Sequence, residues 1–203
     1  MKLYGMLDSP YVRRVAIALK CLDLPFEIDQ VSVFRHFDRF AAINPVVKAP
    51  TLITDDGTAL MDSTLILQHI EDVAGPGRTL RPHDPAARVR GLRLTGLALA
   101  AGEKTVQIVY EHQLRPQEKR HDPWLERVDG QLKAAYDALE EMVDPNGWQC
   151  GETLCEPDIT LAVVWRFTHY MLPGRVDTSD YPRLTAFGLR AESLPAFIAT
   201  PLD

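Results

Sequence analysis

The sequence predicts two domains, an α/β domain with the order β-α-β-α-β-β-α and a bundle of helices after it. Three observations lead to this prediction: short apolar runs alternate with helical repeats over residues 1–77, a proline-rich connector covers 78–85, and helical periodicity dominates from there on. The chain has 203 residues, enough for each domain to bury its own core. We therefore assign residues 1–77 to the first domain, 78–85 to a linker and 86–203 to an all-helical domain.

The first strand and helix follow from the opening residues. Residues 2–6 are a short strand candidate. Ser9 and Pro10 then supply a cap and a first-turn proline for a helix. This helix is expected to reach about Leu22, because its apolar residues recur at helical spacing. The later strands are expected at residues 26–33, 51–53 and 59–61, and the later helices of this domain at 35–43 and 62–73.

The last two strands are expected to form a hairpin. Asp56 and Gly57 lie between two short apolar runs, a pattern that favours a tight turn between antiparallel strands. Asp62 and Ser63 then cap the final helix of the domain, which is expected to end at Gly75.

The helical domain is expected to contain four helices. One of them starts with a weak capping residue, Cys155, so we expect it to be locally less stable by about 1 kcal/mol than with serine there. Asp158 is expected to compensate by accepting hydrogen bonds from backbone N–H groups. Trp165 is expected in the core of this domain, and Phe34 in the core of the first. The four helices are expected at residues 86–114, 123–143, 157–171 and 181–191.

The composition limits the classes of function. A net charge of −6 and a pI near 5.5 argue against a nucleic-acid partner, which would need clustered Lys and Arg. No segment is apolar enough to span a bilayer, and the start lacks the apolar stretch of a signal peptide. The three cysteines match no zinc pattern and suit a reducing compartment. We expect a cytoplasmic protein that uses no metal and contacts neither membrane nor nucleic acid.

Three motifs carry a resemblance to a known family: SPYVRRV at residues 9–15, NPVVKAP at 44–50 and MDS at 61–63. With the strand order and the proline before the third strand, the first domain resembles the thioredoxin superfamily. With the helical half added, the whole chain is similar to cytosolic glutathione S-transferases, most of all the bacterial branch with serine at the thiol position. Residues 9–12 also resemble the glutaredoxin motif Cys-Pro-Tyr-Cys with both cysteines replaced, which excludes dithiol chemistry there.

The resemblance implies glutathione as co-substrate, with its sulfur activated by Ser9. The thiolate is the nucleophile, whereas a free thiol has a pKa of about 8.5. Lowering this pKa by about two units needs roughly 2.7 kcal/mol. A hydrogen bond from Ser9 to the thiolate supplies about 1.5–3 kcal/mol, and the positive end of the first helix about 0.3–1 kcal/mol. The alternative is that Ser9 only caps this helix, a frequent role of serine.

The resemblance also implies the other contacts with glutathione. Ala49 precedes Pro50, expected to be cis, and its backbone would pair with the cysteinyl part of the ligand. Asp62 would meet the α-amino group of the γ-glutamyl end, and Ser63 the α-carboxylate. Lys48 would pair with the glycyl carboxylate. The alternatives are that Asp62 and Ser63 only cap a helix and that Lys48 is a solvated surface residue.

The family further implies a pocket for a small hydrophobic electrophile between the two domains. For each candidate residue, packing between domains or simple surface exposure is an equal alternative. The candidates are Met6, Tyr11, Tyr110 and His112.

Three functions fit these observations. The first is glutathione conjugation to an electrophile, as in detoxification. The second is a glutathione-dependent disulfide reductase or peroxidase on the same scaffold. The third is a glutathione-binding interaction protein without turnover, which the presence of aspartate rather than the commoner glutamate at residue 62 keeps open. In each case the resemblance implies a homodimer.

Overall fold

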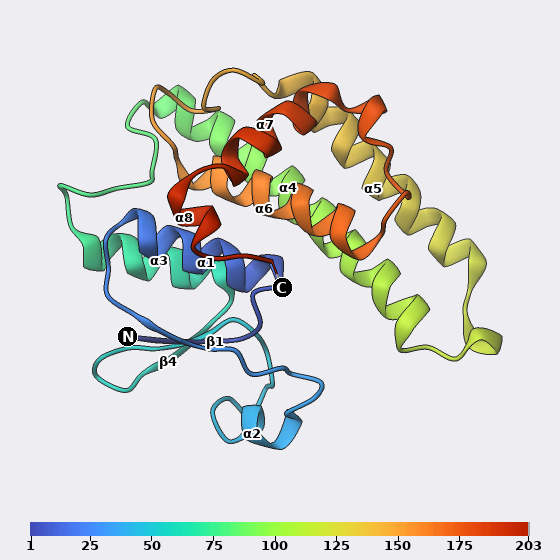
Figure 1. The fold of residues 1–203 in the computed structure, drawn as a ribbon, viewed down its shortest axis with the longest axis horizontal. Helices are drawn as coiled ribbons and strands as arrows, with labels where there is room; N and C mark the ends of the chain where they lie inside the picture. The colour runs from blue at the N-terminus through green and yellow to red at the C-terminus, as the bar shows by residue number, and fades with distance from the viewer. Residues whose placement is uncertain (203) are drawn as a thin grey trace. The chain divides into compact units, whose positions relative to one another are not determined.

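The computed structural model describes residues 1–202 (Figure 1). Its internal contacts divide the chain into two compact units, of which the first comprises residues 1–81 and 194–202 and the second comprises Pro82–Ser193. All the strands named below lie in the first unit, and the second is built from helices. The predicted combination of a thioredoxin-like α/β domain and a helical domain is confirmed.

A mixed sheet lies at the centre of the first unit and consists of β1 (Lys2–Tyr4), β2 (Glu27–Asp29), β3 (Thr51–Ile53) and β4 (Ala59–Met61). The strand order is β2-β1-β3-β4. β1 runs parallel to β2 and antiparallel to β3, which pairs antiparallel with β4. Leu3 of β1 lies opposite Leu52 of β3, and both are fully buried in the core of this unit.

Two helices, α1 (Pro10–Cys21) and α3 (Ser63–Ala74), pack against each other on one face of the sheet (Figure 1). The apolar side chains of α1 between Val12 and Leu19 are all buried. Ile66 and Ile70 of α3 are buried as well, because they lie one helical turn apart on the same face. The start of each helix is therefore held in place by a packed core.

The segment between β2 and the short helix α2 (Phe37–Ala41) differs from the prediction. β2 ends early, because the amide of Val31 donates to the carbonyl of Asp29 at 2.8 Å and turns the chain. The Oγ of Ser32 then accepts the amides of Phe34 and of the next residue, which delays the helix. Phe34 lies in this turn and is 56% exposed, so the expectation that it is a core residue is wrong.

The last described residues belong to the first unit, where the short helix α8 (Pro195–Ile198) packs against α1. Arg13 of α1 is 1% exposed. Its Nε donates to the carbonyl of Thr200 at 2.8 Å, and its Nη2 to the carbonyl of Phe197 at 3.5 Å. The guanidinium also lies 5.7 Å from the centre of the Phe197 ring, within the range of a cation–π contact. The end of the chain is thus fastened to the helix that begins after Ser9.

The second unit is built from four long helices: α4 (Pro85–Gln113), α5 (Asp122–Met142), α6 (Glu156–Met171) and α7 (Pro182–Glu192). Each begins and ends within one residue of its expected bounds. α4 packs against α5 and α6, and α6 packs against α7. Trp165 of α6 is buried, as expected. In the described part of the chain, no helix combines the length and apolar character needed to cross a bilayer.

Asp158 secures the start of α6. Its Oδ2 accepts the amide of Cys155 at 2.9 Å, and its Oδ1 accepts the amide of Gln149 at 2.8 Å. The expected compensation for the weak cap at Cys155 is confirmed. Burial raises the pKa of Asp158 to about 6, against the opposing effect of these two hydrogen bonds.

The raised pKa of Asp158 predicts a pH-dependent stability. Between about pH 4 and pH 6 the folded protein holds a proton on Asp158 that the unfolded chain has released. The contribution of this group is therefore fully present near pH 4 and falls by about 2–3 kcal/mol as the pH rises to 6. Urea unfolding of wild type and Asp158→Asn across this range measures it as the difference between the two proteins. A free energy of unfolding that rises with pH for wild type relative to Asp158→Asn would contradict the prediction.

Candidate functional site

Ser9 lies at the positive end of α1 and is half-buried. Its Oγ is 3.5 Å from the amide nitrogen of Val12, at the long limit of a hydrogen bond. In this cap the Ser9 oxygen acts only as an acceptor, so its O–H remains able to donate to a ligand. The backbone of Ser9 is fixed, because its amide donates to the carbonyl of Met6 at 3.1 Å and its carbonyl accepts the amide of Arg13 at 2.9 Å. Capping and contact with an anionic ligand are therefore compatible roles for Ser9.

Gly5 brings the start of α1 close to the loop before β3. Its φ of +138° favours glycine over residues with a side chain. A Cβ at this position would lie 2.5 Å from Cγ2 of Val12 and 3.1 Å from Cβ of Ala49. The close approach of these two parts of the first unit depends on glycine here.

The peptide bond between Ala49 and Pro50 is cis, as the resemblance implies. Asn44 organises the loop before it. The Nδ2 of Asn44 donates to Oγ1 of Thr51 at 2.9 Å, and its Oδ1 accepts the amide of Val46 at 3.0 Å. Within residues 1–202 the amide and carbonyl of Ala49 have no hydrogen-bond partner. They are therefore available to an extended ligand segment.

Lys48 and Val47 lie in the same loop. The side chain of Lys48 is exposed, and its carbonyl accepts the Thr51 hydroxyl at 2.8 Å. Val47 has a φ of +53°, which is rare for a β-branched residue. Residues in such sparsely populated backbone regions are often found at ligand-binding sites.

Asp62 and Ser63 form the N-terminus of α3. Asp62 has a φ of +73°, and its Oδ1 accepts the amide of Thr64 at 2.9 Å, which makes it the N-cap. Ser63 is the first helical residue and is buried. A helix N-terminus offers unpaired N–H groups and a positive dipole end, which together suit an anionic group.

The thiols of the chain lie outside these positions. Cys21, Cys150 and Cys155 form no disulfide. Burial raises the pKa of Cys21 and of Cys150 to about 11, so both stay protonated near neutral pH. Over residues 1–202, no group of three or more His, Cys, Asp or Glu side chains is arranged to hold a metal ion.

Comparison with known proteins shows which family the chain resembles. Residues 3–78 match the model of the glutathione S-transferase N-terminal domain, and residues 122–187 match that of the C-terminal domain. The chain belongs to the glutathione S-transferase family. A glutathione S-transferase from Methylobacterium radiotolerans, solved in complex with glutathione sulfonate, superimposes with a TM-score of 0.90 at 26% identity, covering 98% of this chain and 93% of that one.

Two sequence relatives agree with this membership. The uncharacterized GST-like protein YibF of Escherichia coli (strain K12) is 28% identical over 164 residues, 81% of this chain and 77% of that protein. The probable glutathione S-transferase BZ2 of Zea mays is 36% identical over 96 residues, which cover 43% of this chain and 41% of that protein.

The sequence of this glutathione S-transferase family member did not reveal that Arg14 contacts the start of α3. It is 1% exposed, and its Nη1 donates to Oγ of Ser63 at 3.1 Å and to Oγ1 of Thr64 at 3.4 Å. The available signal was an arginine within the apolar run of α1. The Ser63 partner is 49 positions away, which no local pattern reveals.

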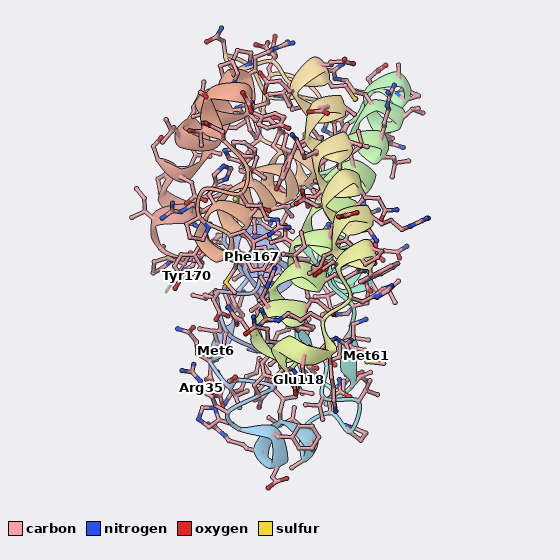
Figure 2. The ribbon with its side chains drawn as sticks, turned by 90° about the vertical axis from the view of Figure 1, so that its right-hand side faces the viewer. Met6, Arg35, Met61, Glu118, Phe167 and Tyr170 are labelled. Atoms are coloured by element: carbon pink, nitrogen blue, oxygen red, sulfur yellow. The ribbon has the colours of Figure 1, made fainter. Side chains whose placement is uncertain are left out.

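The sequence likewise did not reveal that Arg35 lies near the loop before Ser9. Its Nη2 lies 3.9 Å from the sulfur of Met6, and Figure 2 shows the two side chains close together. Burial raises the pKa of Asp8, and the positive charge of Arg35 opposes this shift. The loop that leads from β1 to Ser9 therefore carries the carboxyl group of Asp8 and lies beside the positive charge of Arg35.

The candidates for the electrophile pocket fall in both units of this family member. Met6 and Tyr11 belong to the first unit and are half-buried. Tyr110 and His112 lie on α4 in the second unit and are exposed. Two residues along a helix correspond to about 200° of rotation, so Tyr110 and His112 face different sides of α4. A single pocket can therefore be lined by one of these two side chains but not by both.

Proposed function

We propose that the protein binds glutathione and conjugates its sulfur to a small hydrophobic electrophile. The observation that carries the proposal is Ser9 at the positive end of α1, with an O–H that its helix cap leaves available. Gly5, which has no side chain, lets α1 approach the loop of the cis Ala49–Pro50 bond closely. A glutathione transferase family member from Pseudomonas fluorescens, 26% identical with a TM-score of 0.83, was solved with bound glutathione.

Each part of glutathione has a partner of suitable chemistry in the first unit. The cysteinyl backbone pairs with the unpaired amide and carbonyl of Ala49. The α-amino group binds the carboxylate of Asp62, and the α-carboxylate binds the hydroxyl of Ser63 and the first N–H groups of α3. The glycyl carboxylate pairs with Lys48, whose side chain is exposed.

The reaction needs no general base from the protein. Bound glutathione loses its thiol proton to water, and Ser9 donates a hydrogen bond to the resulting thiolate. The sulfur lone pair then forms the bond to the electrophilic carbon, and the leaving group departs with the bonding electrons. The hydrogen bond to the thiolate supplies about 1.5–3 kcal/mol, close to the roughly 2.7 kcal/mol needed to lower the thiol pKa by two units.

Replacing Asp62 by asparagine tests glutathione binding. Asparagine keeps an oxygen for the Thr64 amide and tolerates a positive φ, but it lacks the charge that faces the α-amino group. We expect glutathione binding, measured by calorimetry, to weaken about tenfold with little loss of stability.

Asp84→Asn is the matched control, since Asp84 caps α4 through the Ala87 amide at 2.7 Å. It should leave glutathione affinity unchanged. No binding by wild type at millimolar glutathione would overturn the proposed function. Binding without turnover of any electrophile would favour the interaction protein, and robust disulfide exchange would favour the reductase or peroxidase.

We also propose that the protein is a homodimer, supported by exposed apolar side chains in each unit. In the first unit these are Met61 of β4 and Leu65 of α3, and in the second Val89 and Leu92 of α4. Sedimentation at micromolar concentration should give a dimer for wild type and a monomer for Leu92→Arg. Leu189→Arg, which changes an equally exposed leucine of α7, should remain dimeric. A monomeric wild type would contradict the proposal.

A further inference from the structure

Arg14 places a buried positive charge directly behind the N-terminus of α3. It projects from α1, and only 1% of its surface is exposed. Its Nη1 reaches Oγ of Ser63 at 3.1 Å and Oγ1 of Thr64 at 3.4 Å. Both partners belong to the first turn of α3, and all three residues lie within the first unit.

The donor and acceptor roles in this contact are fixed by chemistry. A guanidinium has only N–H donors, so Ser63 Oγ must accept from Arg14. The single O–H of Ser63 is then left to donate in another direction. Without Arg14, the same hydroxyl would be free to use its oxygen for a ligand donor or to turn its proton toward the helix backbone. The contact with Arg14 therefore favours Ser63 as a hydrogen-bond donor to a ligand.

The charge of Arg14 acts in the same direction. A hydrogen bond from a cation polarises the Ser63 hydroxyl and strengthens the bond that this hydroxyl donates onward. The site is buried, where the interaction of the cation with a bound anion is screened less than in water. A negatively charged ligand group at Ser63 gains from this arrangement, and a neutral one gains little.

We propose that Arg14 is a positioning residue that prepares Ser63 to bind the α-carboxylate of the γ-glutamyl group. The proposal rests on the proposed function, because it names glutathione as the ligand. It extends that function by making recognition of the carboxylate depend on a residue that does not touch the ligand.

Two ligands separate this role from a merely structural one. The first is glutathione, and the second is its analogue with hydrogen in place of the α-carboxylate, γ-aminobutyryl-cysteinyl-glycine, which keeps the amine on the same carbon. Each is titrated by calorimetry into wild type, Arg14→Met, Arg14→Lys and Ser63→Ala. Arg39→Met is the control, since Arg39 is an exposed cation of the same unit that pairs with Asp29.

We expect Arg14→Met to weaken glutathione binding about tenfold while changing the affinity for the analogue less than twofold. Arg14→Lys keeps one cationic donor and should recover part of the loss. Ser63→Ala should likewise weaken glutathione binding while changing the affinity for the analogue little. Arg39→Met should change neither affinity.

Equal weakening of both ligands by Arg14→Met, or no weakening of either, would overturn the proposal. If Arg14→Met and Arg14→Lys do not fold, Ser63→Ala still tests the carboxylate contact that the proposal requires, because equal effects on both ligands there would also overturn it. Failure of wild type to bind glutathione at all would instead refute the proposed function. Wild type that binds both ligands equally well would refute only the role of Arg14 and Ser63.

Discussion

Replacing Arg13 by methionine should lower the free energy of unfolding of the first unit by about 3 kcal/mol. Among the contacts that the change removes from this buried guanidinium are its hydrogen bonds to the carbonyls of Thr200 and Phe197. Hydrogen bonds to charged groups contribute about 1.5–3 kcal/mol each, and the longer of these two contributes less. Methionine keeps most of the buried volume, so the loss reports mainly on the missing donors.

Urea unfolding measures this loss, and amide hydrogen exchange locates it. We expect exchange to rise in α1 and in residues 194–202, where the donors and acceptors lie. Arg39→Met removes an arginine of the same unit whose pair with Asp29, at 2.7 Å, is exposed, so it should cost less than about 1 kcal/mol. Equal losses in the two variants would contradict the importance of this buried contact.

Replacing Ser9 by alanine should lower kcat/KM for conjugation by about 50-fold near pH 6.5. Without the hydroxyl, the thiol pKa of bound glutathione returns toward its free value of about 8.5, and the thiolate fraction falls by about the same factor. The cost in stability should be small, about 0.5 kcal/mol, because the 3.5 Å bond to the Val12 amide is weak.

Ser9→Thr is the matched variant, since threonine keeps a hydroxyl and is an acceptable N-cap. It should retain much of the wild-type rate. An alanine variant that keeps more than half of the wild-type kcat/KM, while binding glutathione normally, would rule out Ser9 as the activating residue.

The long helices and the hairpin of β3 and β4 could be predicted from sequence, whereas the segment from β2 to α2 and the short helix α8 could not. Helices α4 to α7 show many turns of apolar periodicity, and their ends fell within one residue of the prediction. The end of β2 and the start of α2 depend on the Ser32 hydroxyl, which competes with the helix for nearby amides. Helix α8 has only four residues, and the hydrogen bond from Arg13 to its Phe197 carbonyl spans 184 positions.

The site divides in the same way. The local motifs and the family resemblance predicted the cis bond before Pro50 and the positions of Ser9, Asp62 and Ser63 at helix starts. The support behind them was not predicted, because Arg14 contacts Ser63 through the tertiary packing of α1 on α3. The positive φ of Asp62 likewise follows from the turn between β4 and α3, because aspartate tolerates this conformation but does not by itself specify it.

The measurement that tests the central claim most directly is the pKa of the glutathione thiol in the bound state. Ultraviolet absorbance of the thiolate is recorded against pH for wild type and Ser9→Ala, each saturated with glutathione. We predict a wild-type thiol pKa about two units below the free value of about 8.5, and a return toward that value in Ser9→Ala. The same thiol pKa in both proteins would contradict the claim that Ser9 stabilises the thiolate.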